Sequence, residues 1–384
     1  MKRGPDPFSN TSLVSSRSKA PAMWNWLRRL FQKRTAPRAE RRQPLRLVQK
    51  NQAPVVDDLP ELEPASVGVP PWDLGGVAPS LDAKVVRTAL LGDLFRRGDE
   101  CENDGDRAFI SRLVRIVGTE KLDLPPFPDV ARQLDKLLRQ PEVPMNKVVK
   151  IAERDPSLVK RIWQIACSAN FLEPPTSFQA AVSRVGFDAL WRVGMSTCMY
   201  DAVFRVRGFQ EAVDRVRAHG VVSAEVASWL APDDKGQIYL AGLLHDVGKL
   251  LIYRTASVKP PNPPPSMEYV EQIAQRYHPA IGVLVARSWQ LGDVVTAGAG
   301  FHHAPDMVDE AFRDVAWRVR IADIATYTAE YARNGQDCGG LMALLEIESP
   351  RFDAARAIGK AHGLFDQLSL PGVPPEASPK VPTA

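Results

Sequence analysis

The chain has 384 residues, 45 % of them apolar and 24 % charged, with a formal net charge of +4; this is an ordinary globular composition with room for two or three domains and a sizeable core. It has neither an apolar run near the roughly 20 residues that cross a bilayer nor a secretory signal at its start, which argues against a membrane-spanning or secreted protein. Its four cysteines are far apart and form no CxxC pair, which favours reduced thiols in a cytoplasmic protein over disulfides or a zinc knuckle.

Residues 1–81 are predicted to form a disordered, basic arm. Residues 1–50 carry thirteen Lys and Arg against two acids, a net of +11, which leaves −7 for the rest of the chain. Within this Pro-, Ser- and Arg-rich arm, residues 23–34 form a short basic amphipathic segment. Such a segment can lie on an anionic membrane surface or dock on a partner, or its charges can simply keep the arm soluble. Met23 is also an alternative translation start to Met1.

From about residue 82 onward the apolar residues recur at helical spacing, and period-two alternation is nowhere sustained. This pattern predicts an all-α fold. Residues 82–121 are expected as a helical lead-in, and residues 332–384 as a C-terminal helix with a disordered, Pro-rich tail. Helical stretches are expected at about 85–94, 109–116, 130–138, 144–154, 156–169, 177–190, 192–205, 211–230, 237–254, 267–289, 292–302 and 311–332.

Five of the six histidines fall within residues 219–323, in series with two aspartates, Asp246 and Asp323. Neutral imidazole and carboxylate are the usual ligands of borderline and hard divalent cations. Both aspartates lie in apolar segments, where burying a carboxylate costs roughly several kcal/mol unless it is paired or bound to a cation. Seven N and O ligands suffice for two cations with room for water. The candidate ligands are His219, His245, Asp246, His278, His302, His303 and Asp323.

Each candidate taken alone has a simpler explanation. A lone histidine on an apolar helix face, such as His219, is more often a hydrogen-bonded core residue than a ligand. His278, which opens an apolar helical run, fits a helix cap, and Asp323 fits a core hydrogen bond. The pair His302 and His303 fits a polar surface. The metal hypothesis depends on the whole set, because chance would have to place every member in order.

The adjacent pair His245 and Asp246 is expected within one helix over residues 237–254. Neighbouring positions diverge by about 100° around a helix, so a cation at its edge could contact both side chains. Lys249 lies one turn after His245. It is placed either to reach a bound anion or to form an ordinary helix ion pair with Asp246.

At Gly242-Leu-Leu-His-Asp-Val-Gly-Lys249 the sequence resembles the HDOD domain, a bacterial signalling module related to the HD-superfamily metal-dependent phosphohydrolases. Leu124–Pro128, Asp155–Leu158 and Ala180–Gly186 also match that family's helical lobe. Cys167 departs from it, since the family usually has Asn there.

The resemblance covers residues 122–331 and implies an HD-like helical bundle. The implied parts are an N-terminal helical lobe over 122–205 and an HD-like metal lobe over 206–331. It also implies a bacterial role in signal transduction. With the cysteines that favour the cytoplasm, the basic amphipathic segment at 23–34 predicts a cytoplasmic protein that could contact the inner membrane.

Many HDOD domains have lost metal ligands and act as regulatory modules. Here all seven candidate ligands match ligand positions of the HD-GYP phosphodiesterases, which hydrolyse cyclic di-GMP. The resemblance therefore implies two divalent cations (Mn, Fe, Mg or similar) that activate a shared water for in-line attack. Asp246 would bridge them, with His219, His245 and Asp323 on one cation and His278, His302 and His303 on the other.

The match to HD-GYP enzymes is incomplete. Lys249 matches their phosphate-contacting lysine, and with Asp246 it is the expected catalytic pair. However, no Gly-Tyr-Pro motif follows His303, which puts cyclic di-GMP recognition in doubt. Arg215 stands where trinuclear relatives carry Glu, which argues against a third metal.

Three functions remain open from the sequence. The first is a metal-dependent phosphohydrolase or phosphodiesterase acting on a phosphoester or cyclic nucleotide. The second is a non-catalytic regulatory module, whose site binds metal or a nucleotide without turnover and whose lobe at 124–205 contacts a signalling partner. The third is a helical scaffold with vestigial histidines. Nucleic-acid binding by the arm is a weaker alternative, and the pattern indicates no oligomeric state.

Overall fold

The computed structural model describes residues 74, 77–119, 122, 125–167, 173–203, 206, 208–231, 235–257, 263–348 and 353–367. All of them fall within the unit formed by residues 58–384. Every regular element among them is a helix, which confirms the all-α prediction. None of these helices is long and apolar enough to cross a membrane. The predicted segment at 23–34, nearly all of the basic arm and the tail after residue 367 lie outside the described residues.

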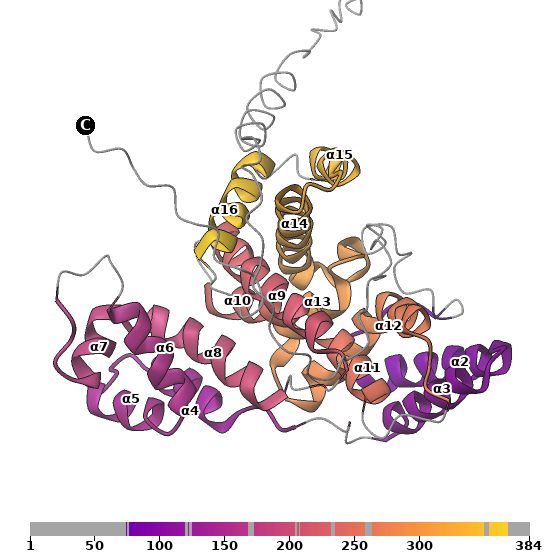
Figure 1. Cartoon of the computed structure of the whole chain (residues 1–384), viewed down its shortest axis with the longest axis horizontal. Coiled ribbons are helices and arrows are strands. Elements are labelled where there is room, and N and C mark those ends of the chain that lie inside the picture. The colour runs from indigo at the N-terminus through magenta and orange to yellow at the C-terminus, as the bar shows by residue number, and fades with distance from the viewer. Residues whose placement is uncertain are drawn as a thin grey trace, which may run out of the picture. The chain divides into compact units, whose positions relative to one another are not determined.

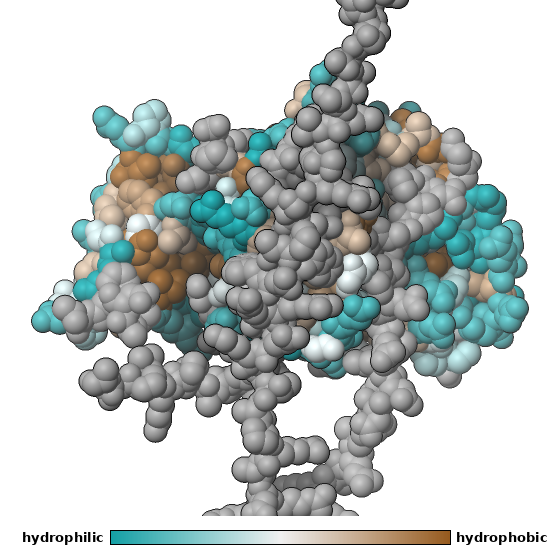
Figure 2. Space-filling model, turned by 90° about the horizontal axis from the view of Figure 1, so that it is seen from above, coloured by the Kyte–Doolittle hydropathy of each residue, from teal (hydrophilic) through white to brown (hydrophobic). Residues whose placement is uncertain are grey.

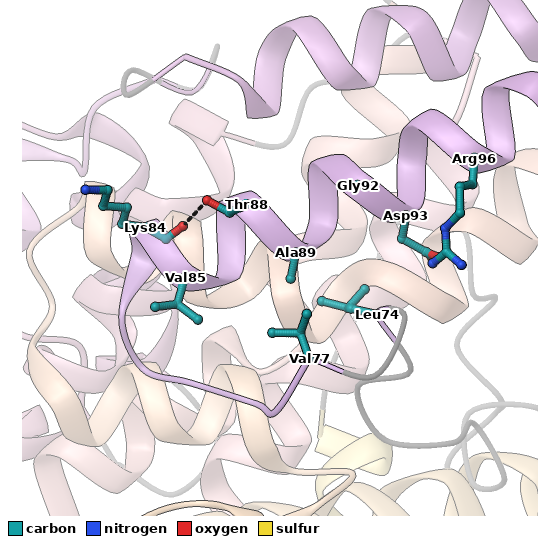
Figure 3. A pocket seen from close by; sticks show the side chains of 9 residues that line it. All are labelled: Leu74, Val77, Lys84, Val85, Thr88, Ala89, Gly92, Asp93 and Arg96. Atoms are coloured by element: carbon teal, nitrogen blue, oxygen red, sulfur yellow. Dashed lines mark hydrogen bonds and ion pairs between the residues drawn. The ribbon is translucent and has the colours of Figure 1, made fainter.

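The lead-in consists of two helices, α2 (Ala83–Glu100) and α3 (Asp104–Val117), which pack on each other and on helix α12 (Met267–Ser288). Asp82 caps α2 by accepting hydrogen bonds from two backbone N–H groups of its first turn. Leu74 and Val77 lie beside α2 and help to line a cavity of about 700 Å³ (Figure 3). Its lining contains none of the candidate metal ligands.

The N-terminal lobe contains α4 (Asp129–Leu138), α5 (Met145–Ala152), α6 (Pro156–Ala166), α7 (Phe178–Val185) and α8 (Phe187–Val203). Helix α8 packs against both α4 and α6 (Figure 1), and Leu134, Leu158 and Ile162 are fully buried. The predicted boundary between residues 190 and 192 is wrong. The chain turns at Gly186, whose φ of 85° is accessible at low cost only to glycine.

The second lobe is built from α9 (Gln210–Leu230), α10 (Lys235–Leu244), α11 (Val247–Ser257), α12, α13 (Gly292–Phe301), a short 3-10 helix η1 (Pro305–Met307) and α14 (Glu310–Arg333). Helix α9 packs against α10 and α14, and α12 packs against α11 and α13. Figure 1 shows these helices crossing one another at the centre of the described chain.

The single helix predicted over 237–254 is also wrong, because the chain leaves the helix at His245 and Asp246, between α10 and α11. Gly248, near the start of α11, lies against the backbone of α12. A Cβ atom there would lie 2.1 Å from the carbonyl oxygen of His278. Only glycine lets α11 approach the backbone of α12 this closely, and the approach brings the turn residues against His278.

Two helices, α15 (Gly339–Glu348) and α16 (Ala354–Gln367), follow α14 where one was predicted. Both pack on α14, and α16 also packs on α9. Their buried residues Leu341, Leu345 and Ile358 join a second apolar core with residues of α9 and α14. These helices therefore cover the outer side of the two helices that carry His219 and Asp323.

Candidate metal centre

The structure brings all seven predicted ligands together. His219 comes from α9, His278 from α12 and Asp323 from α14. His245 and Asp246 occupy the turn between α10 and α11, and His302 and His303 follow the last residue of α13. All seven are buried, from 0 % exposed for His245 to 9 % for His303. The centre therefore lies inside the second lobe, where α9, α10, α12, α13 and α14 meet.

A mixed cluster is formed by His219, His245 and Asp323. Oδ1 of Asp323 lies 2.8 Å from Nε2 of His219 and 3.4 Å from Nε2 of His245. One ligand atom from each of the three residues falls within 4.8 Å of the others. Two imidazoles and a carboxylate at this spacing are a donor set typical of divalent transition metals.

An imidazole cluster is formed by His278, His302 and His303. Nε2 of His278 lies 3.2 Å from Nε2 of His302 and 3.1 Å from Nε2 of His303. A metal–nitrogen bond of about 2.0–2.1 Å places two ligands of one cation about 3.0–3.4 Å apart at tetrahedral or octahedral angles. The observed spacing therefore fits three ligands of a single cation.

Asp246 lies between the two clusters. Its Oδ1 is 3.3 Å from Nε2 of His278, and its Oδ2 is 3.7 Å from Nε2 of His245. Oδ2 also accepts a hydrogen bond of 2.8 Å from Nζ of Lys249. Lys249 is only 3 % exposed, so the Asp246–Lys249 pair considered from the sequence is present, as a buried ion pair.

Backbone carbonyl groups fix the orientation of three of the imidazoles. Nδ1 of His245 lies 2.7 Å from the carbonyl oxygen of Gly242, and Nδ1 of His302 lies 3.1 Å from that of Gly298. A carbonyl oxygen only accepts, so each Nδ1 carries the hydrogen and each Nε2 keeps a lone pair. The same holds for His278 at the carbonyl of Gln275, 2.9 Å away.

The His278-Pro279 pair explains how that third contact arises. The interpretation of His278 as a helix cap is wrong, because it lies in the middle of α12, with Pro279 after it inside the helix. Proline has no N–H, so the carbonyl of Gln275 loses its usual helical donor. Nδ1 of His278 takes that place. Consequently the Nε2 lone pairs of His278 and His302 face each other at 3.2 Å, an arrangement that a cation between them stabilises.

Burial and ion pairing set the charges of the acids and the lysine. Burial alone would raise the pKa of Asp246, but the ammonium of Lys249 and nearby imidazoles outweigh it and hold that pKa well below its usual value. For Asp323 burial is likewise outweighed, chiefly by the hydrogen bond from His219 with His245 close by, and its pKa is also lowered. Burial would lower the pKa of Lys249, but Asp246 raises it well above normal. Both acids and the lysine are therefore charged at neutral pH.

The two clusters differ in how their histidines titrate. Burial lowers the pKa of His278 and His302 well below normal, and that of His303 to about 4. His219 is opposite: burial would lower its pKa, but the hydrogen bond to Asp323 and the contact with Glu330 raise it to about 9. At neutral pH the imidazole cluster is uncharged and ready to bind a cation, whereas His219 holds a proton that a cation must displace.

Three further residues at the centre were not predicted. The ring of Tyr327 packs on His219 with centroids 4.1 Å apart, and its hydroxyl accepts a hydrogen bond of 3.3 Å from Lys249. Glu330 Oε2 lies 3.8 Å from Nδ1 of His219, and Arg320 donates to the carbonyl oxygen of His302. Tyr327 and Glu330 follow Asp323 by four and seven residues, so helical spacing alone places them on its face of α14.

Comparisons with known proteins identify part of the chain. Residues 124–305 match the family model of the HDOD domain. The chain is similar to a curated, uncharacterized protein of Treponema pallidum (strain Nichols), with 24 % identity over 266 residues; the match covers 62 % of this chain and 51 % of that protein. The chain thus spans about half the length of this curated relative.

Two solved structures are among those that match the chain. One is an HDOD domain protein of unknown function from Geobacter sulfurreducens, with 19 % identity and a TM-score of 0.45, covering 68 % of this chain and 94 % of that one. The other, from Shewanella amazonensis SB2B, is named as a proposed metal-dependent phosphohydrolase. It has 20 % identity and a TM-score of 0.46, and the match covers 73 % of this chain and 99 % of that one.

Proposed function

Because residues 124–305 form an HDOD domain, we propose that this HDOD protein is a divalent-metal-dependent phosphohydrolase whose site is the centre formed by the two clusters. One observation carries the proposal. The Nε2 atoms of His278 and His302 face each other at 3.2 Å while backbone carbonyls hold their Nδ1 hydrogens on the far side. Opposed lone pairs in a buried site are unfavourable unless a cation lies between them.

His219, His245 and Asp323 would hold one cation, His278, His302 and His303 the other, and Asp246 would contact both. Five imidazoles favour Mn²⁺, Fe²⁺ or a similar transition metal over Mg²⁺, which prefers oxygen ligands. When bound, such cations supply positive charge that activates water as a nucleophile and neutralises phosphoryl oxygens.

Lys249 and Asp246 are the proposed catalytic residues of the chain itself. The lysine remains an ammonium because Asp246 raises its pKa, so it can offset negative charge that develops on a phosphoryl oxygen. Asp246 holds this ammonium at 2.8 Å and thereby fixes where the phosphoryl group would sit. The proposed substrate class is a phosphoester, including linear or cyclic nucleotides.

The test is hydrolysis of a generic phosphodiester, bis(p-nitrophenyl) phosphate, and of linear and cyclic nucleotides by Mn²⁺-loaded protein. The wild type is expected to turn over at least one of them, and Asp246→Ala to lose at least about 100-fold in kcat/KM. Equal rates for the two proteins would contradict the proposal. Glu225→Ala, on the side of α9 that pairs with Arg192, serves as the matched control and should keep its activity.

A second candidate function is a regulatory module that binds metal or a nucleotide without turnover. It is supported by the hydrophobic residues that gather on the face of the N-terminal lobe, α4–α8, seen in Figure 2. Such a surface suits a signalling partner. Bound Mn²⁺ together with no turnover of any nucleotide would favour this function over hydrolysis.

In either case we propose a cytoplasmic signalling role, with residues 23–34 as a contact to anionic membrane. Their basic and apolar side chains support it. Binding of the full chain to vesicles that contain phosphatidylserine, and its loss on deleting residues 1–50, would test this contact.

A further inference from the structure

His219 is held differently from the three histidines whose Nδ1 atoms contact backbone carbonyls. Its Nδ1 is buried and has no hydrogen-bond partner within 3.5 Å among the described residues, while its Nε2 faces Asp323 at 2.8 Å. An imidazole that binds a cation through Nε2 must carry its hydrogen on Nδ1. Something other than the backbone must therefore receive that hydrogen.

Glu330 on α14 is the group in position to do so. Its Oε2 lies 3.8 Å from Nδ1 of His219, and it too is buried without a hydrogen-bond partner in the described part of the chain. The Glu330 side chain is only 20 % exposed. A donor and an acceptor that both lack partners and lie a few tenths of an ångström beyond hydrogen-bond distance form a pair that a small rotamer shift completes.

Neighbouring residues leave His219 little freedom to turn away from Glu330. The ring of Tyr327 packs against the imidazole with centroids 4.1 Å apart, and Asp323 holds the other edge of the ring. Asp323, Tyr327 and Glu330 follow each other on one face of α14 at spacings of four and three residues. One helix thus supplies a ligand, a packing surface and an acceptor to the same imidazole.

We propose, on the basis of the proposed function, that Glu330 is a positioning residue for the metal site of the mixed cluster. Its carboxylate accepts the hydrogen bond from Nδ1–H of His219 and directs Nε2 of that histidine toward the cation. A carboxylate acceptor also makes an imidazole a stronger ligand than a backbone carbonyl does. The orientation of His219 in the mixed cluster therefore depends on a side chain, whereas His245, His278 and His302 depend on backbone carbonyls.

This difference between the two clusters can be tested by measuring metal binding, without measuring catalysis. The dissociation constants of the two Mn²⁺ equivalents are measured by competition with a chelator in the wild type, Glu330→Ala and Glu330→Gln. Glu330→Ala should weaken one equivalent by about 10–100-fold and leave the other unchanged. Glu330→Gln keeps an acceptor oxygen without the charge, so its loss should be smaller.

Glu225→Ala is the matched control, because Glu225 is a carboxylate of similar exposure, 26 % against 20 %, that pairs with Arg192 away from the centre. It should change neither Mn²⁺ constant. Unchanged constants in Glu330→Ala, or an equal weakening of both equivalents, would overturn the proposal for Glu330 and leave the proposed function standing. A wild-type protein that binds no Mn²⁺ would instead overturn the proposed function, and the role of Glu330 with it.

Discussion

The two lobes of the protein are stabilised in different ways. Between residues 129 and 203, the described side chains that are buried are apolar, among them Leu134, Leu158 and Ile162. The lobe of α9–α14 also has an apolar core, but it buries two aspartates, a lysine and five histidines at its centre. Buried charges cost free energy unless they are paired. The described part of the first lobe therefore buries no charged side chain between residues 129 and 203, whereas the second lobe bears the cost of burying several.

If the second lobe depends on paired buried charges, the largest loss of stability is expected from Asp246→Ala in metal-free protein. The substitution leaves the buried ammonium of Lys249 without its partner at 2.8 Å, which should lower the free energy of unfolding by about 3–5 kcal/mol. The double variant Asp246→Ala, Lys249→Met removes both charges and should recover most of that loss. Urea unfolding in the presence of a chelator measures both, and a double variant no more stable than the single one would contradict the expected pairing.

A substitution in the first lobe should separate stability from metal binding. Leu158 is fully buried, so Leu158→Ala should lower the free energy of unfolding by about 2–5 kcal/mol through the cavity it leaves. Because α6 contributes no ligand, the Mn²⁺ dissociation constants of the folded protein should stay unchanged. Weakened Mn²⁺ binding at a temperature where the variant is folded would show that the lobes are not independent in this respect.

The pH dependence of stability should reveal the histidines of the second lobe. His219 has a pKa of about 9 in the folded protein against an ordinary 6.5, so its contribution is full below pH 6.5 and is lost as the pH rises through about 9. His303 has a folded pKa of about 4, so stability also falls as the pH drops from 6.5 toward 4. The free energy of unfolding of metal-free protein should therefore peak near pH 6.5.

His219→Asn provides the control for this profile. It should flatten the alkaline side, where the slope contributed by one group is at most about 1.4 kcal/mol per pH unit, and leave the acidic side in place. If the free energy of unfolding of the variant still decreased between pH 6.5 and 9, a group other than His219 would be responsible.

The smallest effect is expected from Tyr327→Phe. The hydroxyl accepts from Lys249 at 3.3 Å, but Asp246 already pairs with that ammonium, so its loss should cost about 0.5–1.5 kcal/mol or less. The aromatic ring that packs on His219 is kept, and both Mn²⁺ constants should be unchanged. A weakening of Mn²⁺ binding would mean that the hydroxyl, and not the ring, supports the mixed cluster.

Helical periodicity was enough to predict the all-α fold and most helices, because each buries one apolar face. The prediction failed where the apolar periodicity continues although the helix is interrupted, as at His245 and Asp246. There the close approach that Gly248 permits to the carbonyl of His278 is a tertiary fact that no local pattern contains. The break at Gly186 carried a visible signal, a glycine between two apolar stretches, but the prediction placed the break five residues too late.

The sequence was enough to predict which ligand residues form the centre, but not how they are placed relative to one another. Residue type and scarcity singled out the histidines, and the resemblance to HD enzymes suggested how they divide between two cations. The spacing of His278 and His302 in the sequence says nothing of the 3.2 Å between their Nε2 atoms, which depends on how α12 and α13 cross. Glu330 went unnoticed because a glutamate near the end of a long helix is most often solvated, although its spacing from Asp323 was available.

The most direct test of the metal centre is anomalous diffraction from crystals of Mn²⁺-loaded protein. Two peaks are expected per chain, one bounded by His219, His245 and Asp323 and the other by His278, His302 and His303, with Asp246 between them. No peak at this place, or Mn²⁺ bound only elsewhere on the chain, would contradict the account.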